Sequence, residues 1–144
     1  MARVVATREL LAPRADVWKF LAEPFHLSDW WPGVRGVRPD RHGLARGARW
    51  QVTADARTGG FVGTFLRRPE TTQTVAVVEV REGQLLRLLF AGDGIEAEVR
   101  LEPAANGHTR VMLALEGPLL RLSRSLPRRA LNRLYALCQT AAEL

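Results

Sequence analysis

The sequence predicts an α+β fold in which an antiparallel β-sheet packs against one long C-terminal helix. Residues 12–34 carry the only clear helical pattern before the C-terminus. Residues 48–115 largely alternate apolar and polar side chains and are divided by short turn sequences, as in antiparallel strands with one solvated face. From residue 119 onward, apolar residues return at helical spacing. At 144 residues, the chain is expected to form a single domain spanning residues 1–144.

The predicted strands are separated by turn sequences rich in glycine, asparagine and aspartate. Strands are expected at residues 2–11, 34–39, 48–57, 71–80, 84–90, 95–102 and 109–115, with a further short strand through Phe61 and Phe65. Hairpin turns are expected at Glu82-Gly83, Asp93-Gly94 and Asn106-Gly107. In the first strand, Val5, Thr7 and Leu11 lie on one side and Arg8 on the other.

Two short helices are predicted after the first strand. Pro13 suits a first helical turn, where its missing N–H would be unpaired anyway. Pro24 disfavours helical geometry at the residue before it and can open a second helix, which ends at Pro32-Gly33. Two such helices are too small to bury their own apolar faces, so they are expected to close over the larger sheet.

The C-terminal segment carries an apolar stripe at helical spacing from residue 119 to residue 141. Ser125 can cap a helix, and Pro127 is tolerated in a first turn. The segment is therefore either one helix kinked at Pro127 or a short turn followed by a helix to the end. Its polar side carries arginines, namely Arg121, Arg124, Arg128 and Arg133.

Two local motifs resemble a known family. The first helix has an Ala-Pro-x-x-x-Val-Trp-x-Phe-Leu-Ala pattern at residues 12–22, and a Trp-Pro-x-Val sequence follows at residues 31–34. Together with the order of elements, these motifs resemble the START-like (SRPBCC) superfamily, in particular its polyketide cyclase/dehydrase and lipid-transport branch. The resemblance covers nearly the whole chain. It implies a helix-grip fold: a curved antiparallel sheet of six or seven strands wrapped around a long C-terminal helix, with two short helices after the first strand.

The resemblance also implies a mostly apolar cavity between the sheet and the C-terminal helix. The alternation of the strands selects large apolar side chains for its wall, although each could equally be plain core. The candidate ligand-binding residues are Trp30, Trp31, Trp50, Phe61, Phe65, Leu88, Phe90, Val99, Leu115 and Leu134. Family members place an aromatic residue at the cavity mouth, where Trp30 and Trp31 are expected. We expect the chain to bind a hydrophobic or aromatic small molecule, lipid-like or polyketide-like.

A cyclase or dehydratase acting in the same cavity is the alternative, and a lipid-handling accessory protein is a third hypothesis. For a cyclase, an inward-facing arginine that polarises a carbonyl group would be the expected signature. Alternation groups Arg100 with Glu96 and Glu98 on the solvated face. The direction of Arg87 stays open, because its strand is almost entirely apolar.

Other catalytic chemistry has little support in the sequence. His42 and His108 fall in predicted turns, and His26 is three residues from Asp29, which favours a surface pair over a general base. Cys138 lies on the apolar helix face, where a thiol is usually inert. No metal-ligand spacing and no cofactor motif is present, so neither a metal nor a cofactor is expected.

The net charge of +6 comes almost entirely from arginines scattered over nearly every segment, which disfavours a nucleic-acid site. A membrane-surface role for the basic C-terminal helix is an alternative, but the sheet is expected to use its apolar stripe. No apolar run has the length of a membrane span or forms a signal-peptide core. With a single cysteine, a cytoplasmic location is expected. The protein is expected to be a monomer or a homodimer.

Overall fold

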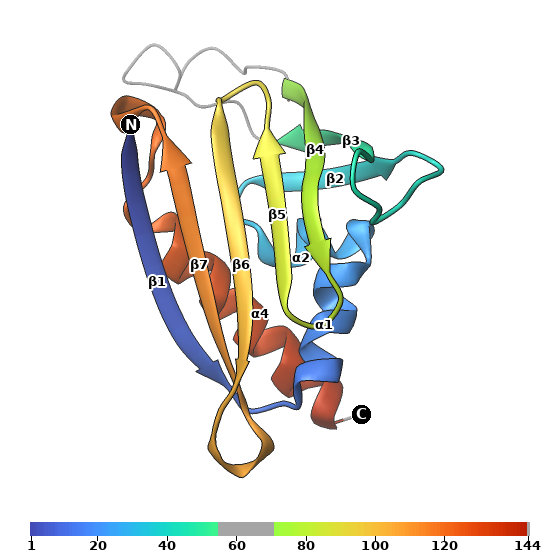
Figure 1. The fold of residues 1–144 in the computed structure, drawn as a ribbon, viewed down its shortest axis with the longest axis vertical. Helices are drawn as coiled ribbons and strands as arrows, with labels where there is room; N and C mark the ends of the chain where they lie inside the picture. Colours follow the sequence, from blue (N-terminus) through green and yellow to red (C-terminus); the bar gives the residue numbers. More distant parts are fainter. Residues whose placement is uncertain (55–70, 144) are drawn as a thin grey trace.

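The computed structural model describes residues 1–54 and 71–143. Within these residues, seven antiparallel strands form one sheet. The sheet curves over one side of the C-terminal helix α4 (Leu126–Glu143), and the short helices α1 (Arg14–Ala22) and α2 (Leu27–Trp30) lie near the edge of the sheet that β2 (Val34–Pro39) forms (Figure 1). The predicted helix-grip architecture is therefore confirmed. Below, the sheet face toward α4 is the inner face, and the opposite one is the outer face.

The strands and helices follow the predicted order closely. The strands are β1 Ala2–Leu10, β2 Val34–Pro39, β3 Arg49–Ala54, β4 Thr71–Arg81, β5 Leu85–Phe90, β6 Ile95–Pro103 and β7 Thr109–Gly117. They lie in the sheet in the order β1-β7-β6-β5-β4-β3-β2. The α-helices are α1 Arg14–Ala22, α2 Leu27–Trp30 and α4 Leu126–Glu143, and short 3-10 turns lie at η1 Pro24–His26, η2 Ala105–Gly107 and η3 Leu119–Arg121. The short strand expected through Phe61 and Phe65 lies outside the described residues.

The helices between β1 and β2 carry the chain from one edge of the sheet to the other. Pro13 precedes α1, and its carbonyl oxygen accepts the first backbone hydrogen bonds from Asp16 and Val17, at 3.0 and 3.1 Å. Pro24 then begins the 3-10 turn that leads into α2. Both α1 and α2 contact α4. The predicted pair of short helices thus closes over the sheet and the C-terminal helix together.

The C-terminal segment follows the second of the two predicted alternatives. A short 3-10 turn is followed by a separate helix, and Pro127 lies in the first turn of α4. The backbone N–H of Arg129 donates to the carbonyl oxygen of Ser125 at 3.0 Å, so the helical hydrogen bonds of α4 start at Ser125. No helix in residues 1–54 or 71–143 is both long and apolar enough to cross a membrane.

The edge strand β1 places Arg8 on the inner face. Ala6 and Leu10 share this side, and Leu10 is fully buried. Val5, on the other side, is 48% exposed. The side chains of β1 thus alternate as predicted, but the side that carries Arg8 is the one that faces α4. This is possible because a long arginine side chain can pack along the helix while its charged end contacts polar groups there.

The outer face of the central strands is a ladder of alternating charges. Arg87 lies there, with its guanidinium 2.5 Å from Glu98, 3.3 Å from Glu96 and 3.4 Å from Glu79. Arg100 also points outward, 3.1 Å from the same Glu98 carboxylate. Arg87 is therefore an outer-face residue, and its direct neighbours along β5 take buried inner positions.

Candidate functional site

The described candidate ligand-binding residues lie on the inner face of the sheet and on the helices that cover it. Those in the described residues come from several elements around α4, and each is at most 5% exposed: Trp30, Trp31, Trp50, Leu88, Phe90, Val99, Leu115 and Leu134. All belong to one contiguous apolar cluster. The other two candidates, Phe61 and Phe65, lie outside the described residues. The structure thus places the described candidates in one cluster of apolar side chains.

Aromatic contacts join the end of α2 to the sheet. The Trp31 ring stacks on Phe90, with ring centroids 4.8 Å apart and an angle of 23° between the planes. Trp30 meets Trp31 edge to face at 5.4 Å. Such aromatic pairs stabilise a fold by more than their buried area alone would, so the tryptophan rings hold this end of α2 against β5. Trp50 is fixed separately, because its indole N–H donates to the carbonyl oxygen of Gly43 at 2.6 Å.

Helix α4 supplies the opposite side of the cluster. Ala130, Leu131, Leu134 and Cys138 are buried there at helical spacing. Burial, with a smaller effect from the nearby Asp16 carboxylate, raises the pKa of the Cys138 thiol from 9.0 to about 11. The thiol is therefore protonated at neutral pH and unsuited to nucleophilic attack.

A polar cluster lies where β1 meets α4. The Arg8 guanidinium donates to the Asn132 side-chain oxygen and lies 3.9 Å from the centre of the Tyr135 ring. The Gln139 side-chain amide donates to the Tyr135 hydroxyl at 3.0 Å. The arginine is thus engaged by α4 through a hydrogen bond and a cation–π contact.

Sequence reasoning selected neither Arg8 nor Tyr135 as a site residue. A usable signal was present for Arg8, because it shares the period-two side of β1 with Ala6 and Leu10. Tyr135 carried a weaker signal, since it follows Leu134 on the edge of the apolar stripe. Their contact joins residues on the first strand and the last helix, which no local pattern reveals.

The histidines occupy the surface positions that the sequence favoured. His26 Nδ1 lies 2.8 Å from Asp29, and the two side chains are 38% and 48% exposed. His108 lies 3.8 Å from Glu9 across the β1–β7 edge. In the part of the chain that the structure describes, no group of His, Cys, Asp and Glu is arranged to hold a metal ion. The contact between His26 and Asp29 thus lies at the surface, as the sequence indicated.

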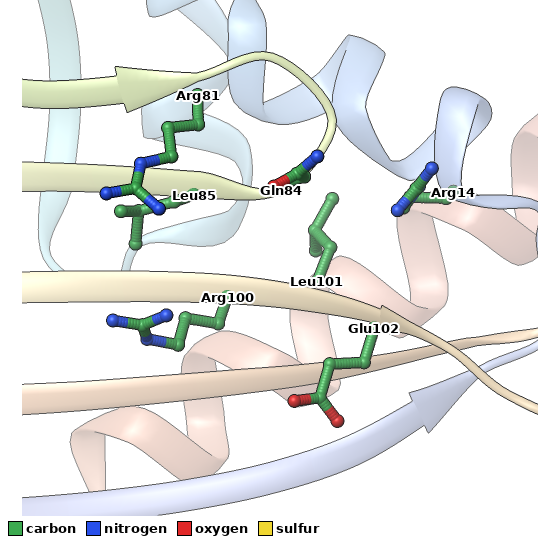
Figure 2. Close-up of a pocket in the computed structure, with 7 residues that line it drawn as sticks. All are labelled: Arg14, Arg81, Gln84, Leu85, Arg100, Leu101 and Glu102. Atoms are coloured by element: carbon green, nitrogen blue, oxygen red, sulfur yellow. The ribbon is translucent and has the colours of Figure 1, made fainter.

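A polar pocket of about 200 Å³ lies at the end of the β4–β5 hairpin, away from the aromatic cluster. It is lined by Arg14, Arg81, Gln84, Leu85, Arg100, Leu101 and Glu102. Figure 2 shows the guanidinium groups of Arg81 and Arg100 on the opposite side from Arg14, so the three do not converge. Arg81 and Arg100 are also neutralised by Glu79 and Glu98, at 3.2 and 3.1 Å. The pocket is therefore a weak candidate for an anion site.

Solved structures with the same fold cover nearly the whole chain. Protein NE0264 from Nitrosomonas europaea superposes with a TM-score of 0.71 at 19% identity, over 99% of this chain and 97% of that one. The AHSA1-like protein from Aeromonas hydrophila gives a TM-score of 0.72 at 16% identity, over 98% and 94%. Protein TTHA0849 from Thermus thermophilus gives 0.71 at 17% identity, over 98% and 99%. At such identities, these likenesses show the fold.

Membership of a family rests on the sequence as well. A search of curated proteins found no match. The family described as polyketide cyclase/dehydrase and lipid transport, however, matches residues 1–138, almost the full length. The motifs at residues 12–22 and 31–34 lie inside this match, and the observed fold is the one that they predicted. The chain belongs to the polyketide cyclase/dehydrase and lipid transport family.

Proposed function

We propose that this protein binds an apolar or aromatic small molecule between the inner face of the sheet and α4. The observation that carries the proposal is the division of the sheet into two faces. On β5 and β6, inner positions hold Leu88, Phe90 and Val99, and outer positions hold charges such as Arg87 and Glu98. An apolar ligand gains affinity by leaving water, at about 25 cal/mol for each Å² of apolar surface buried, so such a face suits it.

Binding is favoured over catalysis because free acids and bases are scarce on this side. Among the described inner-face residues, Arg8 is the charged side chain nearest to α4, and that helix already engages it. The buried hydroxyl of Thr109 is satisfied too, since it donates to the carbonyl oxygen of Ala12 at 2.8 Å. Cys138 is held in its neutral form. A site with these properties recognises shape and apolar surface.

The stacked rings of Trp31 and Phe90 mark where an aromatic ligand would be recognised. Their centroid distance of 4.8 Å is that of an offset stack, and a ligand ring could extend or replace it. Trp31 lies directly after α2, a helix of four residues whose motion would open this end of the cluster. Binding is therefore expected to change tryptophan fluorescence.

The first experiment is native mass spectrometry of the purified protein, followed by denaturing extraction of any bound molecule. A co-purified apolar compound would support the proposal and identify its chemical class, and a lipid would favour the lipid-handling role. If no ligand is present, a panel of lipids and aromatic polyketides is titrated while the melting temperature and tryptophan fluorescence are followed. A protein that responds to none of them would contradict the proposal.

A matched pair of substitutions tests the position of the site. Phe90→Leu changes a ring on the inner face, and Leu89→Ala changes the next residue, which points to the outer face. We expect Phe90→Leu to weaken binding about tenfold through loss of one aromatic contact, and Leu89→Ala to leave it unchanged. Equal effects of the two substitutions in folded variants would contradict the assignment of the ligand to the inner face.

A cyclase or dehydratase activity is the second candidate, favoured by the placement of Arg8 beside Tyr135. A guanidinium and a phenol next to an apolar face could donate to carbonyl oxygens of a poly-ketone chain. Turnover of a poly-ketone substrate that falls in Arg8→Met while binding of a non-reactive apolar ligand stays the same would support this role. Equal turnover by the variant and the unmodified protein would exclude Arg8 from it.

A further inference from the structure

We propose that the turn after β7 docks this protein on anionic phospholipid surfaces. This docking tip consists of Leu119 and Leu120, the first two residues of η3. Their exposed fractions are 65% and 97%, so two large aliphatic side chains stand next to each other in water. The inference does not depend on the ligand proposed above, because the docking tip lies outside the aromatic cluster.

The fold holds the docking tip in this exposed position. The backbone N–H of Arg121 closes the turn on the carbonyl oxygen of Pro118 at 2.9 Å. The Arg121 side chain also donates to the carbonyl oxygen of Gly92 at 3.0 Å, which ties η3 to the β5–β6 turn. On the other side, Leu122 packs against the core. The turn that carries the two leucines is thus anchored by Arg121 and Leu122.

The segment that starts at the docking tip and continues into α4 is positively charged, whereas the neighbouring acidic residues, Glu116 and Asp93, lie on β7 and in the β5–β6 turn. Residues 117–142 contain five arginines and no acidic residue, a local charge of +5. Of these five, Arg121, Arg124 and Arg128 are exposed and lie closest to the leucines in sequence. None of the five forms an ion pair with another described residue, in contrast to Arg87 on the outer face, which has three acidic neighbours. Their charge is therefore available to an external anion.

The combination of aliphatic tip and positive charge fits a lipid bilayer better than a nucleic acid. Nucleic-acid surfaces stack bases on aromatic rings, and the two residues here are leucines. A bilayer interface accepts aliphatic side chains among its acyl chains and attracts arginine through its anionic headgroups. The apolar stripe of α4 cannot do this, because it is buried against the sheet.

The N-terminus adds to the same end of the molecule. Ala2 pairs with Gly117, so Met1 lies beside the residue that leads into the docking tip. The Met1 side chain is fully exposed. Figure 1 shows the N-terminus next to the orange turn that follows β7. One end of the sheet thus presents several exposed apolar side chains.

Flotation with lipid vesicles tests the proposal. We expect the protein to float with vesicles of phosphatidylcholine containing phosphatidylglycerol, and to stay in solution with phosphatidylcholine alone. Each basic residue near an anionic surface strengthens binding roughly fivefold, so added salt should weaken the binding strongly. A protein that does not bind the anionic vesicles at low salt overturns the proposal.

Two pairs of variants separate the apolar and the electrostatic contributions. Leu119→Ser with Leu120→Ser should reduce vesicle binding by roughly tenfold or more, since the apolar area entering the interface is lost. Leu11→Ser is the control, because Leu11 is 44% exposed but lies at the opposite end of β1. Arg124→Gln with Arg128→Gln should weaken binding by roughly 25-fold, and Arg41→Gln with Arg46→Gln serves as its charge-matched control.

Thermal melting confirms that each variant is folded before it is scored. Loss of binding in the leucine and the arginine variants, but not in their controls, supports docking through this tip. Unchanged binding of the leucine variant would overturn it and indicate general electrostatic adsorption. Equal losses in the arginine variant and in its control would also overturn it, because any positive charge would then serve.

Discussion

Replacing Arg87 by methionine is expected to destabilise the protein and to leave ligand binding unchanged. Methionine keeps much of the side-chain length but removes the charge that joins three carboxylates across β4, β5 and β6. The Arg87 side chain is 31% exposed, and that of its closest partner, Glu98, is 16% exposed. The contacts between these charges are thus partly shielded from solvent and lie on the sheet face away from α4.

The magnitude follows from what each contact contributes. The hydrogen bond to Glu98 joins two charged groups at 2.5 Å and is worth about 1.5–3 kcal/mol. The contacts to Glu79 and Glu96, at 3.4 and 3.3 Å, are more exposed and are worth about 0.2–1 kcal/mol each. Since Glu98 keeps Arg100 at 3.1 Å, part of its stabilisation survives. We therefore expect a loss of about 2 kcal/mol and a Tm lower by roughly 5–10 °C.

The pH dependence provides an independent check. Burial acts to raise the pKa of Glu98, but hydrogen bonds from Arg100 and Arg87 outweigh it and hold the pKa below 4.5. A carboxyl group whose pKa is lower in the folded than in the unfolded protein stabilises the fold at pH values above its unfolded-state pKa. This contribution is lost as the pH falls through the folded-state pKa. The difference in unfolding free energy between the two proteins should therefore shrink below about pH 4.5.

Urea unfolding of Arg87→Met, Glu98→Gln and the double variant measures the coupling between the two residues. A coupling energy near zero would refute the assignment of the stabilisation to this pair. Loss of ligand binding in folded Arg87→Met would refute the inference that the outer-face charges are separate from the site.

The remaining predictions concern single contacts. Cys138 should react slowly with a thiol reagent at about pH 8, because folding raises the pKa of its thiol from 9.0 to about 11. Its contribution to stability should be complete below a pH of 9.0 and should fall as the pH rises to about 11. Gly117→Ala should lower the free energy of unfolding measured in urea by about 1–3 kcal/mol, because the new methyl group would lie 3.1 Å from a backbone carbonyl oxygen of the β5–β6 turn. Gly36→Ala should not lower it, because the space around Gly36 is open. Arg8→Met should lower the unfolding free energy by about 1–2 kcal/mol by removing its contacts to α4, and the exposed Arg3→Met should have little effect.

Local patterns were sufficient for most of the fold. Val34–Pro39 was predicted with its observed bounds, and the turns at Asp93-Gly94 and Asn106-Gly107 separate the strands where glycine provides a positive φ. The prolines placed the helix boundaries, because their effect on the backbone does not depend on tertiary contacts. Elements defined by their own residues were thus predictable.

Side-chain directions in two strands were not predictable from the same patterns. In β5, apolar residues fill both faces, so nothing in the strand itself assigns Arg87 to a side. Its direction is fixed by carboxylates on neighbouring strands. The inner position of Arg8 depends likewise on Asn132 and Tyr135, which reach it only after α4 has packed. The exposure of Leu119 also escaped prediction, because its spacing fits the apolar stripe of a helix that begins only at residue 126.

The strand order has a consequence for how the chain folds during synthesis. Within the described sheet, β1 pairs only with β7, and its register joins Ala2 to Gly117 and Leu10 to Thr109. During synthesis, β1 therefore lacks its hydrogen-bonding partner until β7, the last strand of the described sheet, has emerged. Pairings so distant in sequence slow folding, because the entropy of closing a long loop is lost before any contact compensates it. Nascent chains stalled before residue 109 should accordingly leave β1 open to protease, and chains extended past residue 117 should protect it.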